Sequence, residues 1–214
     1  MPDGCDFVEL ERARLLAAVD VRANEARELA RWMAAHPELA LQEHEASARY
    51  RAWLSQCSFR VESPMAGMDT AFVATHGSDA APLRVALLAE MDALPELGHA
   101  CGHSLSGPAT LLAASALAQV LPADGVRLHV VGCPAEEIGL GKRRLVEAGA
   151  FADVDVALMA HAAGMRRAHR LFLGNRKFEF RFRGRAAHAA AYPERGVNAL
   201  DAVMHTTSRQ ARNA

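Results

Sequence analysis

The sequence has little of what marks several large classes of protein. Its 214 residues include four cysteines, too few for the disulfide framework of a small secreted domain. We therefore expect reduced thiols at Cys5, Cys57, Cys101 and Cys133. An excess of one charge is also missing, because 24 basic residues nearly balance 25 acidic ones at a net charge of -1. Nucleic-acid binding usually needs a basic excess, so no nucleic-acid partner is expected.

Long apolar runs are absent as well. Runs such as 85–89 and 154–160 are far shorter than the roughly 20 residues that cross a bilayer, so no membrane span is expected. The first residues, Met-Pro-Asp-Gly-Cys-Asp, lack the basic start and apolar stretch of a secretory signal, which favours a cytoplasmic location. The composition that is present, 51% hydrophobic and 23% charged, is that of a globular protein with a sizeable core.

The order of the expected elements indicates the fold class. Apolar residues at helical spacing predict helices over residues 8–35, 42–56, 108–120 and 141–150. Short apolar or β-branched runs between turn residues predict buried strands over residues 70–75, 84–89, 126–132 and 154–160. Strands and helices in this order favour an α/β fold, a three-layer α/β/α sandwich around a mostly parallel sheet.

The chain is expected to divide into two domains, residues 1–167 and residues 168–214. Phenylalanine and charged residues alternate over 177–183, which predicts a strand with one face that is solvated or faces a partner. A helix is expected to start within 196–200. One strand and the start of one helix cannot bury a core of their own, so the second domain is expected to be the incomplete beginning of a smaller α+β unit.

Residues that could carry chemistry come directly after the predicted strands. These residues are Asp92, Glu136, Glu137 and His161. Open α/β sheets build their sites at the carboxyl ends of their strands, so we expect these side chains to lie on one edge.

Cys101 and His103 lie just before the helix that is expected from about residue 108. Thiol, imidazole and carboxylate together suit a transition metal such as zinc, and the set could serve two ions. A carboxylate beside a metal-bound water can take a proton as the water attacks a carbonyl and pass it to the leaving amine. Glu136 and Glu137 could divide the tasks of base and ligand.

Each signal has a plainer interpretation when it is taken alone. A Cys-x-His pair arises readily by chance in a chain with ten histidines, adjacent glutamates usually begin a solvated helix, and a histidine after an apolar strand is commonly structural. The combination at one sheet edge is what favours a metal site. We expect surface or capping roles for the histidines without a partner pattern: His36, His44, His76, His129, His169 and His205. Cys133 is expected to be a small buried residue that could also line the site, and residues 139–142 to form a turn before a helix.

Several short motifs carry a resemblance to a known family. They are residues 36–39 (His-Pro-Glu-Leu), 89–95 (Ala-Glu-Met-Asp-Ala-Leu-Pro), 98–103 (Gly-His-Ala-Cys-Gly-His), 134–137 (Pro-Ala-Glu-Glu), 159–161 (Met-Ala-His), 184–190 and 193–202. With these motifs the sequence resembles metallopeptidase family twenty, which includes aminoacylases, glutamate carboxypeptidases and the hippurate and indole-acetyl-amino-acid amidohydrolases. It is most similar to the dipeptidase-like amidohydrolase branch of that family, and the motifs run over nearly the whole chain.

The resemblance implies a role for each candidate residue. The implied ligands of two divalent ions, zinc or else manganese or cobalt, are Cys101, His103, Glu137 and His161. Glu136 is then the general base, and Asp92 orients a ligand. His188 is implied to lie in a lid and dimerisation domain and to steady the tetrahedral oxyanion in the neighbouring subunit, so a homodimer is implied.

The sequence departs from the family pattern in two ways. Ser104 stands where many relatives have aspartate, and the relatives are much longer, with a final metal-ligand histidine near their C-terminus. We therefore expect a chain that is truncated at its C-terminus. The predicted function is metal-dependent hydrolysis of the amide bond in dipeptides or N-acyl amino acids. The alternative is a truncated, non-catalytic remnant or binding module that retains the fold.

Overall fold

The structure is a computed structural model, and it describes residues 4–168 and 179–210. Contacts within the chain divide it into two units, Met1–Met165 and Arg166–Ala214. Within the described ranges, no helix is both long and apolar enough to cross a membrane.

The first unit contains helices and strands where the sequence predicts them, but the prediction of a buried strand over residues 154–160 is wrong in its burial, because only Val156–Leu158 form a strand and all three residues are exposed. Its helices are α1 (Gly4–Ala35), α2 (His44–Gln56), α3 (His103–Val120) and α4 (Gly141–Glu147). Its strands are β1 (Arg60–Glu62), β2 (Phe72–His76), β3 (Leu83–Glu90), β4 (Val126–Cys133) and β5 (Val156–Leu158). β1 is an addition to the elements expected from the sequence, because three residues are too few to give a periodic signal.

The strands form a mixed sheet in the order β1-β2-β4-β3-β5. β3 pairs parallel with both β4 and β5, so that Leu87 lies opposite Val130 on one side and Leu158 on the other. β2 pairs antiparallel with β4, and β1 pairs antiparallel with β2. The α/β class is confirmed, and the parallel strand pairs found among residues 4–168 join β3, β4 and β5, the three strands that the candidate residues follow. β5 forms one edge of the sheet, and all three of its residues are exposed.

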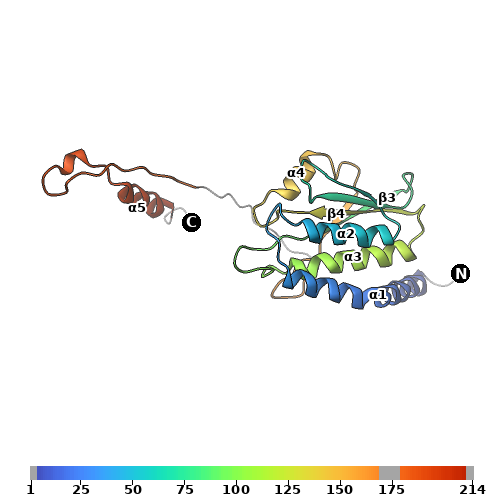
Figure 1. Cartoon of the computed structure of the whole chain (residues 1–214). Helices are drawn as coiled ribbons and strands as arrows, with labels where there is room; N and C mark the ends of the chain where they lie inside the picture. The colour runs from blue at the N-terminus through green and yellow to red at the C-terminus, as the bar shows by residue number, and fades with distance from the viewer. Residues whose placement is uncertain (1–3, 169–178, 211–214) are drawn as a thin grey trace. The chain divides into compact units, whose positions relative to one another are not determined.

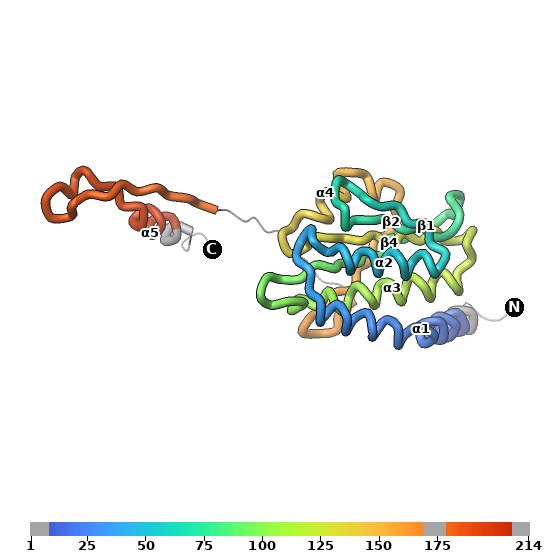
Figure 2. Tube along the Cα trace, in the orientation of Figure 1, coloured from blue at the N-terminus to red at the C-terminus, as the bar shows by residue number. Residues whose placement is uncertain are grey.

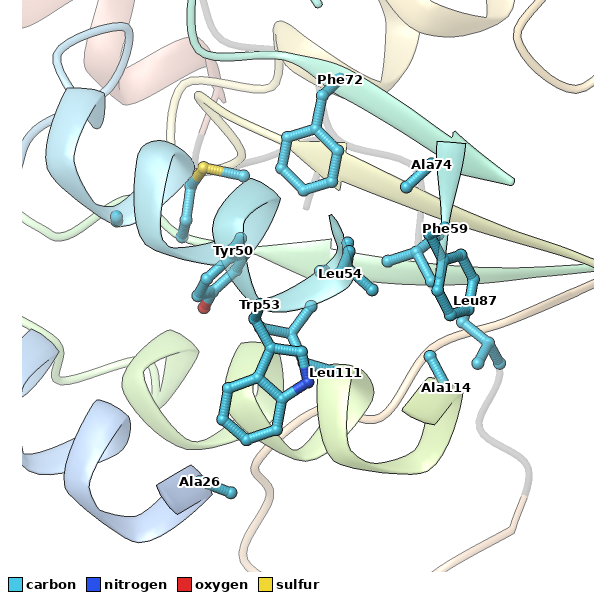
Figure 3. Packing of buried hydrophobic residues seen from close by; sticks show 14 of the residues in the cluster. Ala26, Tyr50, Trp53, Leu54, Phe59, Phe72, Ala74, Leu87, Leu111 and Ala114 are labelled. Carbon is cyan, nitrogen blue, oxygen red and sulfur yellow. The ribbon is translucent and has the colours of Figure 1, made fainter. Parts of the chain in front are cut away.

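Helices cover both faces of the sheet and make the three layers that the sequence predicts. Figures 1 and 2 show α1, α2 and α3 on one face and α4 on the other. The larger core lies on the three-helix side, where Tyr50, Trp53 and Leu54 of α2 lie between the sheet and α3 (Figure 3). Burial of one such apolar side chain contributes about 1.5–3 kcal/mol. The Trp53 indole also donates a hydrogen bond of 2.7 Å to Ser115 Oγ on α3, which joins the two helices.

The smaller core lies between the sheet and α4. Leu145 of α4 packs with Val131 and Cys133 of β4. Cys133 is fully buried, as the sequence predicts, and burial raises the pKa of its thiol to about 12. Among the described side chains, Cys57, Cys101 and Cys133 are free thiols.

The start of α3 differs from the expectation. The helix begins at His103 and not near residue 108, and Pro108 lies inside it. Proline removes one backbone donor, so the helix loses a single hydrogen bond, while buried contacts of His103 and Ser104 hold its first turn in place. Gly102 caps this helix at a φ of 90°, a left-handed conformation that glycine adopts without strain. His103 is therefore fixed on a helical turn and does not lie on a loop.

His129 is the one exception among the described histidines for which a surface or capping role is expected. It lies in the middle of β4 and is 5% exposed, whereas His36, His44 and His205 are exposed and His76 is half-buried. Both faces of β4 are covered by helices, so a polar residue in this strand is buried whatever its type. Burial lowers the pKa of His129, with Arg127 and Arg84 acting in the same direction against Asp153.

The lowered pKa of His129 predicts a pH dependence of stability. Below the ordinary histidine pKa of 6.5 the unfolded chain binds a proton that the folded chain does not, so the free energy of unfolding falls as the pH falls. This residue contributes at most about 1.4 kcal/mol per pH unit. Urea unfolding at about pH 7.5 and about pH 5.5 is expected to show a shallower decrease for His129→Gln than for the wild type. An equal decrease in the free energy of unfolding from about pH 7.5 to about pH 5.5 in the two proteins would show that His129 is not a source of this pH dependence.

The second unit is small in its described part. It contains the 3₁₀ helix η1 (Pro193–Arg195), the helix α5 (Ala199–Gln210) and an antiparallel bridge between Arg185 and Val197. The helix start expected within 196–200 is confirmed. The strand expected over 177–183 is wrong for residues 179–183, which pair with no strand among the described residues, because alternation alone does not supply the neighbour that a strand needs. Lys177, Phe178 and His169 lie outside the described residues.

Candidate metal centre

The candidate residues follow the carboxyl ends of the three parallel strands. β3 ends at Glu90, β4 at Cys133 and β5 at Leu158, and the parallel pairing brings these ends to one edge of the sheet. Asp92, Glu136 and His161 come two to three residues after their strands. The first turn of α3 brings His103 to the same edge, where its ring lies 5.6 Å from that of His161.

Asp92 fixes the ring of His103. The His103 Nδ1 atom lies 2.8 Å from the carbonyl oxygen of Asp92 and 3.3 Å from its carboxylate. Burial works to lower the pKa of His103, but the hydrogen bond to Asp92 and the charge of Glu90 outweigh it and raise the pKa to about 9. Asp92 also accepts the backbone N–H of Glu137 at 2.9 Å. Although burial opposes ionisation of Asp92, these hydrogen bonds lower its pKa.

The other ring nitrogen of His103, Nε2, faces side chains that could bind a metal ion together with it. Two groups of side chains bring potential ligand atoms to within 4.8 Å of one another: Glu90, His103 and His161 in one, and His103, Glu136 and Glu137 in the other. Glu90 Oε2 and His103 Nε2 are both buried, lie 3.3 Å apart and have no hydrogen-bond partner among the described residues. Unpartnered buried nitrogen and oxygen atoms are costly, and a divalent cation would satisfy both. The residues present therefore fit a metal ion.

Cys101 is placed differently from the other proposed ligands. It belongs to neither of the two groups within the described part of the chain, and its thiol is hydrogen-bonded to the carboxylate of Glu137. This hydrogen bond, together with burial, raises the pKa of the Cys101 thiol to about 11. A thiol must lose its proton to bind a metal, so the role of Cys101 as a ligand stays a prediction.

Two residues of the site, Glu90 and Lys142, are missing from the sequence-based candidates. Glu90 is the last residue of β3 and is 1% exposed. The Lys142 ammonium group forms an ion pair with Glu90 Oε1 and lies 3.7 Å from Glu136 Oε1. Burial works to lower the pKa of Lys142, but its contacts with Glu90 raise it. The sequence feature that could have indicated Glu90 is its position, two residues before Asp92, at the end of an apolar strand.

Glu43 positions the segment that leads to Glu136. It is fully buried, and its carboxylate accepts hydrogen bonds from the backbone N–H of Ala135 at 2.8 Å and from the Thr70 hydroxyl at 2.9 Å. It also accepts the N–H of Leu41 at 3.0 Å. Ala135 adopts a φ of 55°, a conformation that costs a non-glycine residue energy and that the buried carboxylate helps to hold.

His188 belongs to the second unit. It is exposed, and its Nδ1 atom accepts the backbone N–H of Ala191 at 3.2 Å. Its implied role toward a neighbouring subunit stays a prediction.

Histidine and carboxylate side chains that converge at the ends of parallel strands form a candidate metal site in an α/β domain. The chain belongs to peptidase family M20/M25/M40, which matches residues 86–211, and the resemblance seen in the motifs is thereby confirmed. The Xaa-Arg dipeptidase of Mus musculus is 40% identical over 210 residues, which are 92% of this chain and 48% of that protein. A p-aminobenzoyl-glutamate hydrolase chain of Escherichia coli is 36% identical over 195 residues, which are 81% of this chain and 40% of that protein.

A solved structure supports the same grouping. A dinuclear metal binding peptidase of Bacillus subtilis matches with a TM-score of 0.58 at 26% identity, over 64% of this chain and 42% of that one. The chain thus spans about half the length, or less, of the relatives that it matches.

Proposed function

We propose that this chain is a metal-dependent amidohydrolase that acts on dipeptides or N-acyl amino acids. The observation that carries the proposal is the pair of donor groups that share His103 beside the carboxylate of Glu136. The names of the relatives support this substrate class, since one is a dipeptidase and the other a hydrolase of p-aminobenzoyl-glutamate.

Each residue of the site has a task in this proposal. The proposed holders of two divalent ions, zinc or else manganese or cobalt, are Cys101, His103, Glu137 and His161. Such ions, when bound, lower the pKa of water and polarise the amide carbonyl. Glu136 takes the proton of the attacking water and delivers it to the leaving nitrogen. Asp92 holds the His103 ring so that Nε2 faces the ion.

The proposal extends to assembly and location. A homodimer would let the exposed His188 of one subunit steady the oxyanion in the other. The amide substrates are small molecules, and the near balance of charge favours them over a nucleic-acid partner. A cytoplasmic location agrees with the reduced thiols expected from the sequence.

The experiment is a hydrolysis assay on the purified chain loaded with zinc, manganese or cobalt. A panel of dipeptides and N-acyl amino acids is expected to include substrates that are cleaved with metal, not cleaved after chelation, and cleaved again once metal is restored. Metal analysis is expected to give about two ions per chain. If no substrate shows metal-dependent cleavage, the chain is better described as a non-catalytic remnant or binding module.

A further inference from the structure

We propose that Glu90 is itself a metal ligand, binding one divalent ion through Oε2 between His103 and His161. The inference rests on the proposed function and adds a protein ligand that the motif resemblance does not supply. Three features of Glu90 carry it: its distances to the two histidines, its burial and its ion pair with Lys142.

The distances fit the edges of a coordination polyhedron. Glu90 Oε2 lies 3.3 Å from His103 Nε2 and 3.7 Å from His161 Nε2. Two ligand atoms that bind one tetrahedral ion at about 2.1 Å are separated by about 3.4 Å. The two imidazole rings are nearly perpendicular, at 82°, so both can direct a nitrogen toward the same point without stacking. A monodentate carboxylate oxygen would complete three protein ligands.

The ion pair with Lys142 provides a partner for only one of the two carboxylate oxygens of Glu90. Lys142 contacts Oε1, whereas Oε2 is buried, faces the Nε2 atoms of His103 and His161, and lacks a hydrogen-bond partner among the described residues. A buried carboxylate needs partners on both oxygens to offset its loss of hydration. A cation at Oε2 supplies the missing partner, and Lys142 then acts as a positioning residue that fixes Oε1.

The backbone around Glu90 is held rigidly enough to place a ligand. Its carbonyl oxygen accepts a hydrogen bond of 3.2 Å from the Tyr50 hydroxyl, inside the core. Gly107 of α3 passes so close that an added Cβ would overlap Tyr50 Oη and lie 2.6 Å from the Glu90 carbonyl oxygen. α3, which carries His103, is therefore fixed directly against the end of β3.

Cobalt(II) titration of the metal-free chain tests the proposal, because both affinity and the visible absorption spectrum report the ligand set. Glu90→Gln is expected to weaken cobalt binding at one site by at least about 10-fold and to shift the absorption bands. Glu147→Gln, which removes the same charge from an exposed position on α4, is the matched control and should bind as the wild type does. A folded Glu90→Gln protein with unchanged affinity and spectrum overturns the proposal, as does a wild-type chain that binds no cobalt.

Two further variants keep the test decisive. If Glu90 serves only to neutralise Lys142, the double variant Glu90→Gln, Lys142→Met will bind cobalt as the wild type does, which also overturns the proposal. Weak binding by the double variant supports it. Should Glu90→Gln fail to fold, Glu90→Asp replaces it, with a shifted spectrum expected and an unchanged spectrum counting against the proposal. A wild-type chain that binds cobalt while Glu90→Gln leaves affinity and spectrum unchanged fails this proposal alone, whereas a wild-type chain that binds no cobalt counts against the proposed function as well.

Discussion

Glu136→Gln is expected to lower kcat for amide hydrolysis by roughly 10²- to 10⁴-fold while the bound metal is retained. Glutamine preserves the shape of the side chain but cannot accept a proton from water. Glu136 is suited to proton transfer because it is one-third exposed, so that water can reach it, and yet lies 3.9 Å from His103 Nε2 at the centre of the site.

The neighbouring residue provides the control for this prediction. Glu137→Gln makes the same chemical change one position further on, next to the Cys101 thiol, and is expected to lose metal as well as activity. Metal content and kcat measured on both variants therefore separate the base from the ligand. The opposite outcome, with metal lost from Glu136→Gln and kept by Glu137→Gln, would exchange the two roles.

Glu43→Ala is expected to lower the free energy of unfolding by about 2–5 kcal/mol, since it removes hydrogen bonds to a charged group and leaves the buried N–H of Ala135 without a partner. Activity is expected to fall too, because Ala135 precedes the proposed base, Glu136. Urea unfolding and kcat, measured on the same preparation, check both effects.

Glutamine at the same position is the matched control. Glu43→Gln can still accept both backbone hydrogen bonds through its amide oxygen, so it is expected to stay close to the wild type. Burial raises the pKa of Glu43, which means that ionisation costs stability as the pH rises above 4.5. The stability of Glu43→Gln relative to the wild type should therefore increase from acid to neutral pH. A loss in Glu43→Gln as large as that in Glu43→Ala would show that the hydrogen bonds are not the cause.

The position of the site could be predicted from the sequence, whereas some of the residues that form it, Glu90 and Glu43, could not. Asp92, Glu136 and His161 stand out because each is polar and follows an apolar run, and parallel strands end at a common edge. Glu90 ends the apolar run itself, so hydrophobic periodicity treats it as a strand boundary. Glu43 lies in a turn before α2, and its partner Ala135 is 92 residues away, a separation that no local pattern bridges.

The fold shows the same division between local and long-range information. The positions of β3 and β4 could be predicted because both are runs of mostly apolar residues. Strands that are covered on both faces of a sheet require such runs. The antiparallel insertion of β2 beside β4 could not be inferred, since strand order depends on tertiary pairing. The sequence predicts the start of α3 too late, near Pro108, because proline is over-represented in the first turn of helices. In this protein Pro108 lies inside the helix, which begins at His103.

β5 has a consequence for the accessibility of the centre. Val156 and Leu158 are 44% and 54% exposed on an edge strand, and an apolar edge of this kind is a template for another strand, including one from a second molecule. His161 follows this edge closely and is 36% exposed at its side chain, whereas Glu90 and His103 are almost completely enclosed. Pairing of another strand with β5 would therefore shield His161 from bulk water. Self-association at this edge would then slow the exchange of a bound ion with solvent.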